Sequence, residues 1–230
     1  MEYVTLEEHG EGLVVLSADR PPANAMDLTL LADLLEAIEL LKAKEPRAMV
    51  LAGRPGFFSA GVDLKAVPGY GPEEQRRMVT SINAMALGVY ELPFPVVGAI
   101  TGHAIAGGLV LALCADIRVV SRAGRYGLTE IKVGVPYPQA AIGVVAAELA
   151  PHSARVLALG NELIGAVEGV RLGVFDEMVE PEQVLPRALS VARGLAAFSP
   201  DTYARTKGEL RGATAARLAA AAAEDPLLAR

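Results

Sequence analysis

Tryptophan is absent from this 230-residue sequence, and aromatic residues make up only 5% of it. Cys114 is the single cysteine, so no disulfide can form within the chain, as is typical of a reducing compartment. Acidic residues exceed basic ones by 27 to 21, which excludes the broad basic surface that nucleic-acid binding needs. No apolar run approaches the ~20 residues that cross a bilayer, and the acidic start MEYVTLEEHG is unlike a signal peptide. These absences predict a cytoplasmic protein with neither a nucleic-acid nor a membrane partner.

Motifs for metals, for nucleotide cofactors and for acyl transfer by a serine nucleophile are also missing. The three histidines and the one cysteine are scattered, and no metal site has plausible ligand spacing. The phosphate loop GxxxxGK[ST], the dinucleotide motif GxGxxG and the acyl-transfer elbow GxSxG are all absent. The sequence therefore predicts no metal and no nucleotide or redox cofactor.

The residues that are present predict an α/β fold. Hydrophobic residues make up 52% of the chain, which is enough for a large buried core. Residues 3–9 and 13–17 are β-rich runs separated by glycines, and they predict a hairpin. Apolar residues then recur at helical spacing from Leu28 to Leu41, and Asp27 can cap that helix.

Short apolar runs at 48–52 and 96–100 predict strands that are buried on both faces, and residues 116–120 predict another strand. A loop at 53–62 and a helix at 73–92 separate the first two runs, and this alternation predicts a mostly parallel sheet. The last third of the chain is expected to be helical, with an Ala-rich surface helix near its end. The expected helices are 139–150, 152–160, 183–198, 201–211 and 213–223.

Two segments combine tight turns with backbone groups that could contact a ligand. The first is Phe57 to Lys65 (FFSAGVDLK), where Ala60 and Gly61 allow a close approach of the backbone to a ligand. The second is Thr101 to Leu109 (TGHAIAGGL), which is predicted as a glycine-rich turn into an apolar helix at 109–115. The start of such a helix has unpaired N–H groups that could stabilise an anion.

A third segment, Tyr126 to Pro136 (YGLTEIKVGVP), contains Glu130 as a lone carboxylate in largely apolar surroundings. An apolar pocket raises the pKa of a carboxyl group and makes it a usable acid or base near neutral pH. Alternatively, Glu130 forms a salt bridge to Lys132 or Arg125. Both interpretations are open from these residues alone.

The three segments together resemble the enoyl-CoA hydratase/isomerase (crotonase) family. Phe58 to Leu64 is similar to the family signature F-[SA]-A-G-x-D-[LI]. Gly102 to Arg118 is similar to G-x-A-x-[AG]-G-G-x-x-x-[AL]-x-x-x-D-x-R, and Glu130 follows an aromatic-Gly pair as in the family. The segment 173–179 (GVFDEMV) is also family-like, and the resemblance covers roughly residues 3–210.

The resemblance implies a crotonase-like spiral of ββα repeats with mostly parallel sheets over residues 1–185. Residues 186–230 would then be a C-terminal helical layer used for trimerisation, in a homotrimer or hexamer. Family members commonly carry a longer final segment that helps to close the acyl or CoA site. The acyl chain-length preference is therefore left open.

The resemblance also implies that the peptide N–H groups of Val62 and Gly107 form an oxyanion hole for the thioester carbonyl of an acyl-CoA substrate. Such a hole stabilises an enolate. Coenzyme A would be part of the substrate, so no separate cofactor is implied. The family's CoA contacts match Pro22, Ala23, Ala60, Asp63 and Leu64.

Hydratases of this family use two glutamates. The first lies three residues after the oxyanion-hole glycine, where this sequence has Val110, and the second aligns with Glu130. A single carboxylate is enough for an isomerase that takes a C2 proton from a 3-enoyl-CoA and returns it to C4 to give a 2-enoyl-CoA. The pattern favours this isomerase, with Glu130 as acid and base. Two alternatives remain: a hydratase that uses Glu130 with His103, and a catalytically silent acyl-CoA-binding homologue. His103 could also have only a structural role, bonded to the loop backbone.

Overall fold

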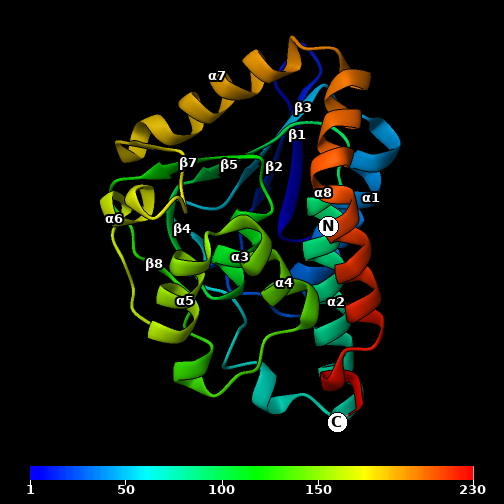
Figure 1. The fold of residues 1–230 in the computed structure, drawn as a ribbon, viewed down its shortest axis with the longest axis vertical. Helices are drawn as coiled ribbons and strands as arrows, with labels where there is room; N and C mark the ends of the chain where they lie inside the picture. The colour runs from blue at the N-terminus through cyan, green and yellow to red at the C-terminus, as the bar shows by residue number, and fades with distance from the viewer. Residues whose placement is uncertain (230) are drawn as a thin grey trace.

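A computed structural model describes residues 1–229, which form two β-sheets with helices around them (Figure 1). The larger sheet contains β1 (Val4–Glu8), β2 (Leu13–Ala18), β3 (Ala48–Ala52), β5 (Val96–Ile100), β7 (Ile117–Ser121) and β9 (Glu177–Val179), in that order. The smaller sheet contains β4 (Gly56–Ser59), β6 (Gly102–Ile105) and β8 (Tyr126–Gly127). Within both sheets only the β1–β2 hairpin is antiparallel. The predicted α/β class, the hairpin and the mostly parallel sheet are confirmed.

A helix follows each pair of strands as far as α4, and the rest of the described chain is mostly helical. The helices are α1 (Leu28–Lys44), α2 (Pro72–Tyr90), α3 (Gly107–Leu113), α4 (Gln139–Glu148), α5 (Pro151–Gly160), α6 (Ala166–Arg171), α7 (Val184–Ala196) and α8 (Pro200–Ala223). Short 3-10 turns lie at Val67–Gly69, Ile131–Val133, Pro181–Gln183 and Pro226–Ala229. Asp27 caps α1 as predicted, because its side chain accepts a hydrogen bond from Leu30 N at 2.8 Å.

Three ββα repeats determine where the candidate functional site lies. In each repeat a strand of the large sheet is followed by a strand of the small sheet and then by a helix: β3–β4–α2, β5–β6–α3 and β7–β8–α4. The small-sheet strands are parallel, with Ser59 opposite Ala104 and Ile105 opposite Gly127, and the register of β4 against β6 shifts between Phe57 and Ser59. Their carboxyl ends therefore meet at one edge, and the segments that follow them start side by side.

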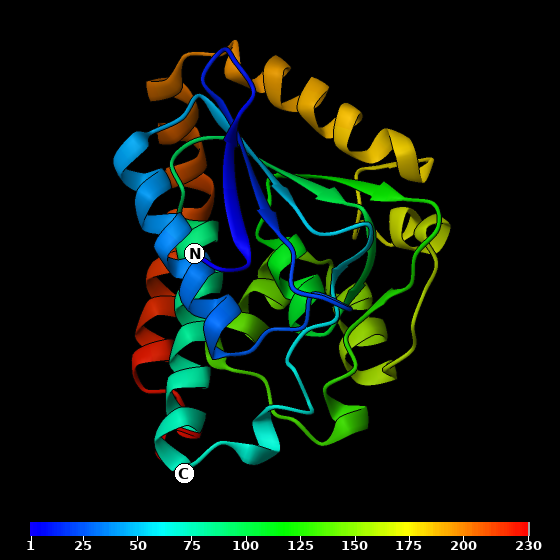
Figure 2. The same ribbon diagram turned by 180° about the vertical axis from the view of Figure 1, so that it is seen from behind.

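The central strands β3 and β5 of the large sheet are buried on both faces. Successive side chains of a strand alternate between the two faces. Val14 and Leu16 of β2 join the core beneath α1 and α2. Leu13 and Val15 face α7, which lies across the sheet on the other side (Figures 1 and 2). Small residues of α7 cover this second face: Ala188, Ala192 and Ala196.

Four short strands were not predicted: β4, β6, β8 and β9. The expected loop at 53–62 contains β4, and the expected turn at 102–108 contains β6, so that α3 starts at residue 107 instead of 109. The strands β4 and β6 pair with each other, and their glycines serve this pairing. A Cβ on Gly102 would lie 2.1 Å from the carbonyl carbon of Gly56. Gly102, one of the glycines that suggested a turn, is instead required by a close strand-to-strand contact.

The C-terminal helix is longer and better packed than expected. The predicted helices at 201–211 and 213–223 are one continuous helix, α8, which runs alongside α2 (Figures 1 and 2). Its Ala-rich part is not simply a surface helix, because Ala215 and Leu218 are buried. Leu218 packs so closely on α4 that a Cβ on Gly143 would meet it at 2.0 Å. The role of residues 186–230 in trimer formation stays a prediction.

None of the helices within residues 1–229 combines the length and the apolar character needed to cross a membrane.

Candidate active site

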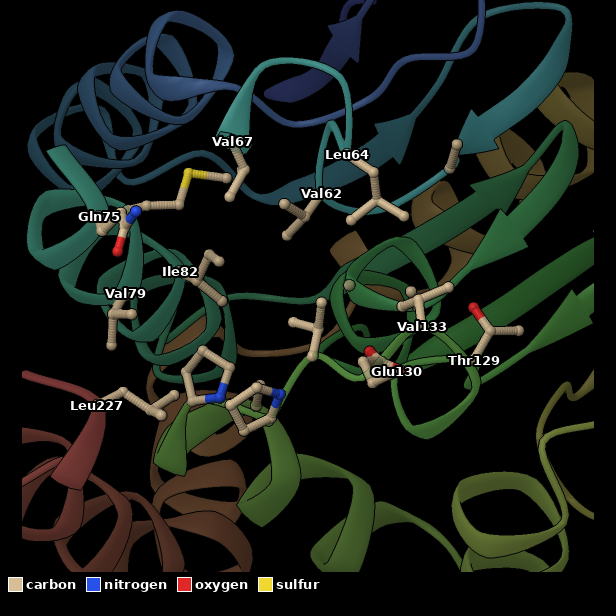
Figure 3. A pocket seen from close by; sticks show the side chains of 18 of the residues that line it. Val62, Leu64, Val67, Gln75, Val79, Ile82, Thr129, Glu130, Val133 and Leu227 are labelled. Atoms are coloured by element: carbon tan, nitrogen blue, oxygen red, sulfur yellow. The ribbon is translucent and has the colours of Figure 1, made fainter. Parts of the chain in front are cut away.

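A cavity of about 280 Å³ opens where the three repeats meet (Figure 3). Val62 and Leu64 line it from the segment after β4, and Val79 and Ile82 line it from α2 (Figure 3). The lining is mostly apolar. Its polar side chains are Gln75, Arg76, Thr129 and Glu130.

Gly61 brings the segments after β4 and β6 into contact. A Cβ on this residue would lie 2.8 Å from Ala106 Cβ and 3.0 Å from Gly107 N. Gly61 also has a φ of +77°, which glycine adopts at no steric cost. The neighbouring Ala106 has a φ of +53°, an unusual value for a residue with a side chain. The tight approach of the two segments therefore depends on the absence of a side chain at Gly61.

The amides of Val62 and Gly107 are left free by this arrangement. Neither N–H donates a hydrogen bond to any residue from 1 to 229. Two of the neighbouring amides are paired, since Asp63 N donates to Met26 O at 2.9 Å and Ala106 N to Gly127 O at 2.8 Å. Val62 and Gly107 both line the cavity. Two free donors in an apolar cavity suit a developing negative charge on oxygen.

Glu130 lies across the cavity from α2, directly before the 3-10 turn Ile131–Val133 (Figure 3). The residue is only 7% exposed, and its Oε2 atom has no hydrogen-bond partner in the described chain. Burial raises the pKa of the Glu130 carboxyl above its ordinary value, and the nearby Tyr137 hydroxyl offsets part of this rise. The alternative of a salt bridge is wrong. Lys132 and Arg125 are exposed, and no cationic group of residues 1–229 pairs with Glu130.

His103 and Val110 do not line the cavity. His103 is on β6, where its Nδ1 atom accepts a hydrogen bond from Arg125 N at 3.1 Å and its ring lies 4.7 Å from the Phe57 ring. Val110 is fully buried in α3. In the part of the cavity wall that the structure describes, Glu130 is therefore the one carboxylate.

The residues predicted to contact CoA lie close together, but not all of them reach the cavity. Ala60 and Leu64 line it. Pro22 and Ala23 flank the segment after β4, where Ala23 O accepts a hydrogen bond from Ala60 N at 3.1 Å. Asp63 is held in an ion pair with Arg20 at 2.9 Å, so its carboxylate is occupied within the protein. Its contribution there is to fix the turn that carries Val62.

Several cavity residues were missed by the sequence interpretation. Val79 and Ile82 come from α2, and Leu227 comes from the turn Pro226–Ala229 at the far end of the chain (Figure 3). Their apolar character gives no local signal of a ligand site. Tyr137, whose hydroxyl is buried next to Glu130, was also missed. Its position between two prolines is the one unusual feature that could have drawn attention to it.

Across residues 1–229 no group of three or more His, Cys, Asp or Glu side chains is arranged to hold a metal ion.

Comparison with known sequences identifies the family. Residues 8–228 match the profile of the enoyl-CoA hydratase/isomerase family. The mitochondrial enoyl-CoA delta isomerase 1 of Homo sapiens is 34% identical over 220 residues, which cover 91% of this chain and 70% of the human protein.

Comparison with solved structures gives the same result. The human mitochondrial delta3-delta2-enoyl-CoA isomerase superposes with a TM-score of 0.88 at 31% identity, covering 95% of this chain and 87% of that one. The enoyl-CoA hydratase EchA3 of Mycobacterium ulcerans superposes with a TM-score of 0.89 at 29% identity, covering 94% and 95%. The predicted crotonase-like fold is thus confirmed. The chain belongs to the enoyl-CoA hydratase/isomerase family.

Proposed function

We propose that this protein is an enoyl-CoA isomerase that converts a 3-enoyl-CoA into a 2-enoyl-CoA. The observation that carries the proposal is a single carboxyl group, Glu130, in an apolar cavity that also holds the two free amides of Val62 and Gly107. A proton shift within one substrate needs one group that accepts a proton and gives it back.

The first half of the reaction removes a proton. The thioester carbonyl oxygen accepts hydrogen bonds from the N–H groups of Val62 and Gly107. The Glu130 carboxylate takes a proton from C2, and the electrons of the broken C–H bond move into the conjugated enolate, whose charge rests on the carbonyl oxygen. Each N–H donor of this kind is worth about 10²–10³ in rate.

The second half returns the proton. Glu130, now protonated, delivers it to C4, and the double bond forms between C2 and C3 as the carbonyl is restored. No atom is gained or lost, and Glu130 ends as a carboxylate. A raised pKa suits both steps, because the group must accept a proton readily and hold it long enough to deliver it.

The substrate is an acyl-CoA thioester in this proposal. Ala60 and Leu64 at the cavity, with Pro22, Ala23 and Asp63 behind them, would contact the CoA moiety. The apolar wall formed by Val79, Ile82 and Leu227 would receive the acyl chain.

We also propose that the protein forms a homotrimer or hexamer and that it is cytoplasmic, although the human relative is described as mitochondrial.

A hydratase is the first alternative. It would need a second group to activate water, and His103 was the candidate. The placement of His103 on β6, facing Phe57 and away from the cavity lining, favours the isomerase over this alternative. A silent acyl-CoA binder would share the whole cavity and differ only in turnover.

Two substrates separate these possibilities. The purified protein is given a 3-enoyl-CoA and, separately, a 2-enoyl-CoA, and the absorbance of the conjugated thioester is followed. We expect the absorbance to rise from the 3-enoyl substrate and to stay nearly constant with the 2-enoyl substrate. Loss of absorbance from the 2-enoyl substrate would indicate hydration. Binding without change in either would indicate a silent binder.

A further inference from the structure

Two polar atoms beside the cavity are shielded from solvent without a hydrogen-bond partner among residues 1–229: Glu130 Oε2 and the Tyr137 hydroxyl. Buried polar atoms are nearly always paired, so an unpaired couple needs an explanation. The Tyr137 hydroxyl offsets part of the rise that burial causes in the pKa of the Glu130 carboxyl, and Glu130 adds to the rise that burial causes in the pKa of Tyr137. In the structure the contact falls outside good hydrogen-bond geometry.

The path of the chain brings Tyr137 back to Glu130. The amides of Val133 and Val135 donate to the Glu130 carbonyl oxygen at 3.2 and 3.0 Å, which closes a compact loop. Gly134, with a φ of +70°, makes the sharp turn in it. Tyr137 follows between two prolines that restrict the backbone, immediately before α4 begins. The ring packs against the main core, so its hydroxyl is held in a fixed place.

Tyr137 is placed to act on Glu130 and not on the substrate. Glu130 lines the cavity, whereas Tyr137 does not. Oε2 is enclosed in the protein without a partner. A donor on Oε2 would leave the other carboxylate oxygen, Oε1, free to react.

Few other charges can influence this carboxyl group. Arg76 of α2 lines the same cavity, and Lys132 lies on the adjacent 3-10 turn, but both side chains are exposed. Asp63, on the segment after β4, is neutralised by its ion pair with Arg20. The described parts of α4 and the turn Pro226–Ala229 contribute only uncharged residues to the cavity.

We propose that Tyr137 is a positioning residue for the reaction: its hydroxyl donates a hydrogen bond to Glu130 Oε2 and holds the carboxylate with Oε1 directed at the substrate. The inference rests on the proposed role of Glu130 for its kinetic consequence, but the contact itself can be measured without turnover.

The kinetic test is the pH profile of Tyr137→Phe. A donor to the carboxylate favours the ionised form, so removing it raises the pKa of Glu130 further. We expect the acid limb of kcat/KM to move up by about one pH unit and kcat to fall roughly tenfold, with unchanged affinity for a saturated acyl-CoA. Tyr203→Phe is the matched control, because Tyr203 also donates to a carboxylate, Asp116 Oδ2 at 3.1 Å, remote from the cavity. An acid limb that stays in place in Tyr137→Phe, or moves equally in Tyr203→Phe, would overturn the proposal.

A second measurement does not depend on catalysis. The carboxyl stretch of Glu130 is followed by infrared difference spectroscopy as a function of pH, with Glu130→Gln identifying the band. We expect the midpoint to rise in Tyr137→Phe and the band to shift, as a lost hydrogen bond requires. An identical band and midpoint would refute the contact, even if the protein proves to be an isomerase. A changed midpoint in a protein without isomerase activity would instead sustain the contact and refute the proposed function.

Discussion

Replacing Gly61 by alanine is expected to separate the two amides that we propose as the oxyanion hole. The new Cβ would lie 2.8 Å from both Ala106 Cβ and Ile105 O, and 3.0 Å from Gly107 N. These neighbours are backbone or a short side chain, so the segment itself must move. A shift that removes one of the two donors costs about 10²–10³ in kcat/KM.

The matched control is Gly173→Ala. Gly173 has a φ of +70°, close to the +77° of Gly61, but a Cβ there meets nothing within 4 Å. Both variants therefore carry the backbone strain of alanine at positive φ, which is about 1–2 kcal/mol. Only Gly61→Ala has the steric conflict, so we expect only this variant to lose activity beyond its loss of stability.

The assay is the rate of 2-enoyl-CoA formation, measured at a temperature where thermal unfolding shows both variants to be folded. Affinity for a saturated acyl-CoA is measured alongside it. We expect Gly61→Ala to lower kcat/KM strongly and to weaken binding far less. Wild-type kcat/KM in Gly61→Ala, or an equal loss in Gly173→Ala, would refute the reasoning.

Three further predictions concern the cavity and its support. Because burial raises the pKa of Glu130, its carboxyl form is favoured in the folded protein at low pH, and this contribution to stability is lost as the pH rises through the raised value. Glu130→Gln should therefore raise the melting temperature at pH 8 and change it little at pH 4, and an equal effect at both would contradict the burial argument. Asp225 is 2% exposed and accepts hydrogen bonds from Asn83 Nδ2, Gln139 N and Leu227 N, so Asp225→Ala should lower the free energy of unfolding by about 2–4 kcal/mol. Denaturant unfolding would measure this, and the exposed ion pair of Asp19 gives a control, Asp19→Ala, with an effect below ~1 kcal/mol. Leu227→Ala should enlarge the cavity and raise the preference for longer saturated acyl-CoAs by roughly fourfold per added methylene that fits. Binding assays with acyl-CoAs of different lengths would measure this, and an unchanged preference would show that Leu227 does not face the acyl chain.

Much of the fold could be predicted because its signals are local. The hairpin of β1 and β2 is marked by glycines between two β-rich runs, and Asp27 is marked by its place before a helical pattern. The buried strands β3 and β5 are continuous apolar runs. The strands β4 and β6 could not be predicted, because their four-residue sequences are stabilised by pairing with each other and not by their own pattern.

The candidate site divides in the same way. Val62 and Gly107 were assigned from the resemblance to the family, and Glu130 was singled out as a lone carboxylate in an apolar segment. The structure places all three at one cavity. The wall formed by α2 and Leu227 depends on how distant parts of the chain pack, which no local pattern shows. Whether Glu130 is paired or free could also be decided only in three dimensions.

The central claim is that one carboxyl group carries the proton from C2 to C4. The most direct test supplies a 3-enoyl-CoA with deuterium at C2, in ordinary water, and locates the label in the 2-enoyl-CoA product of a single turnover. Glu130 is 7% exposed, so exchange of its proton with solvent should be slow compared with delivery. The account predicts deuterium at C4 of the product. Product that carries only hydrogen at C4, formed at the same rate by Glu130→Gln, would contradict it.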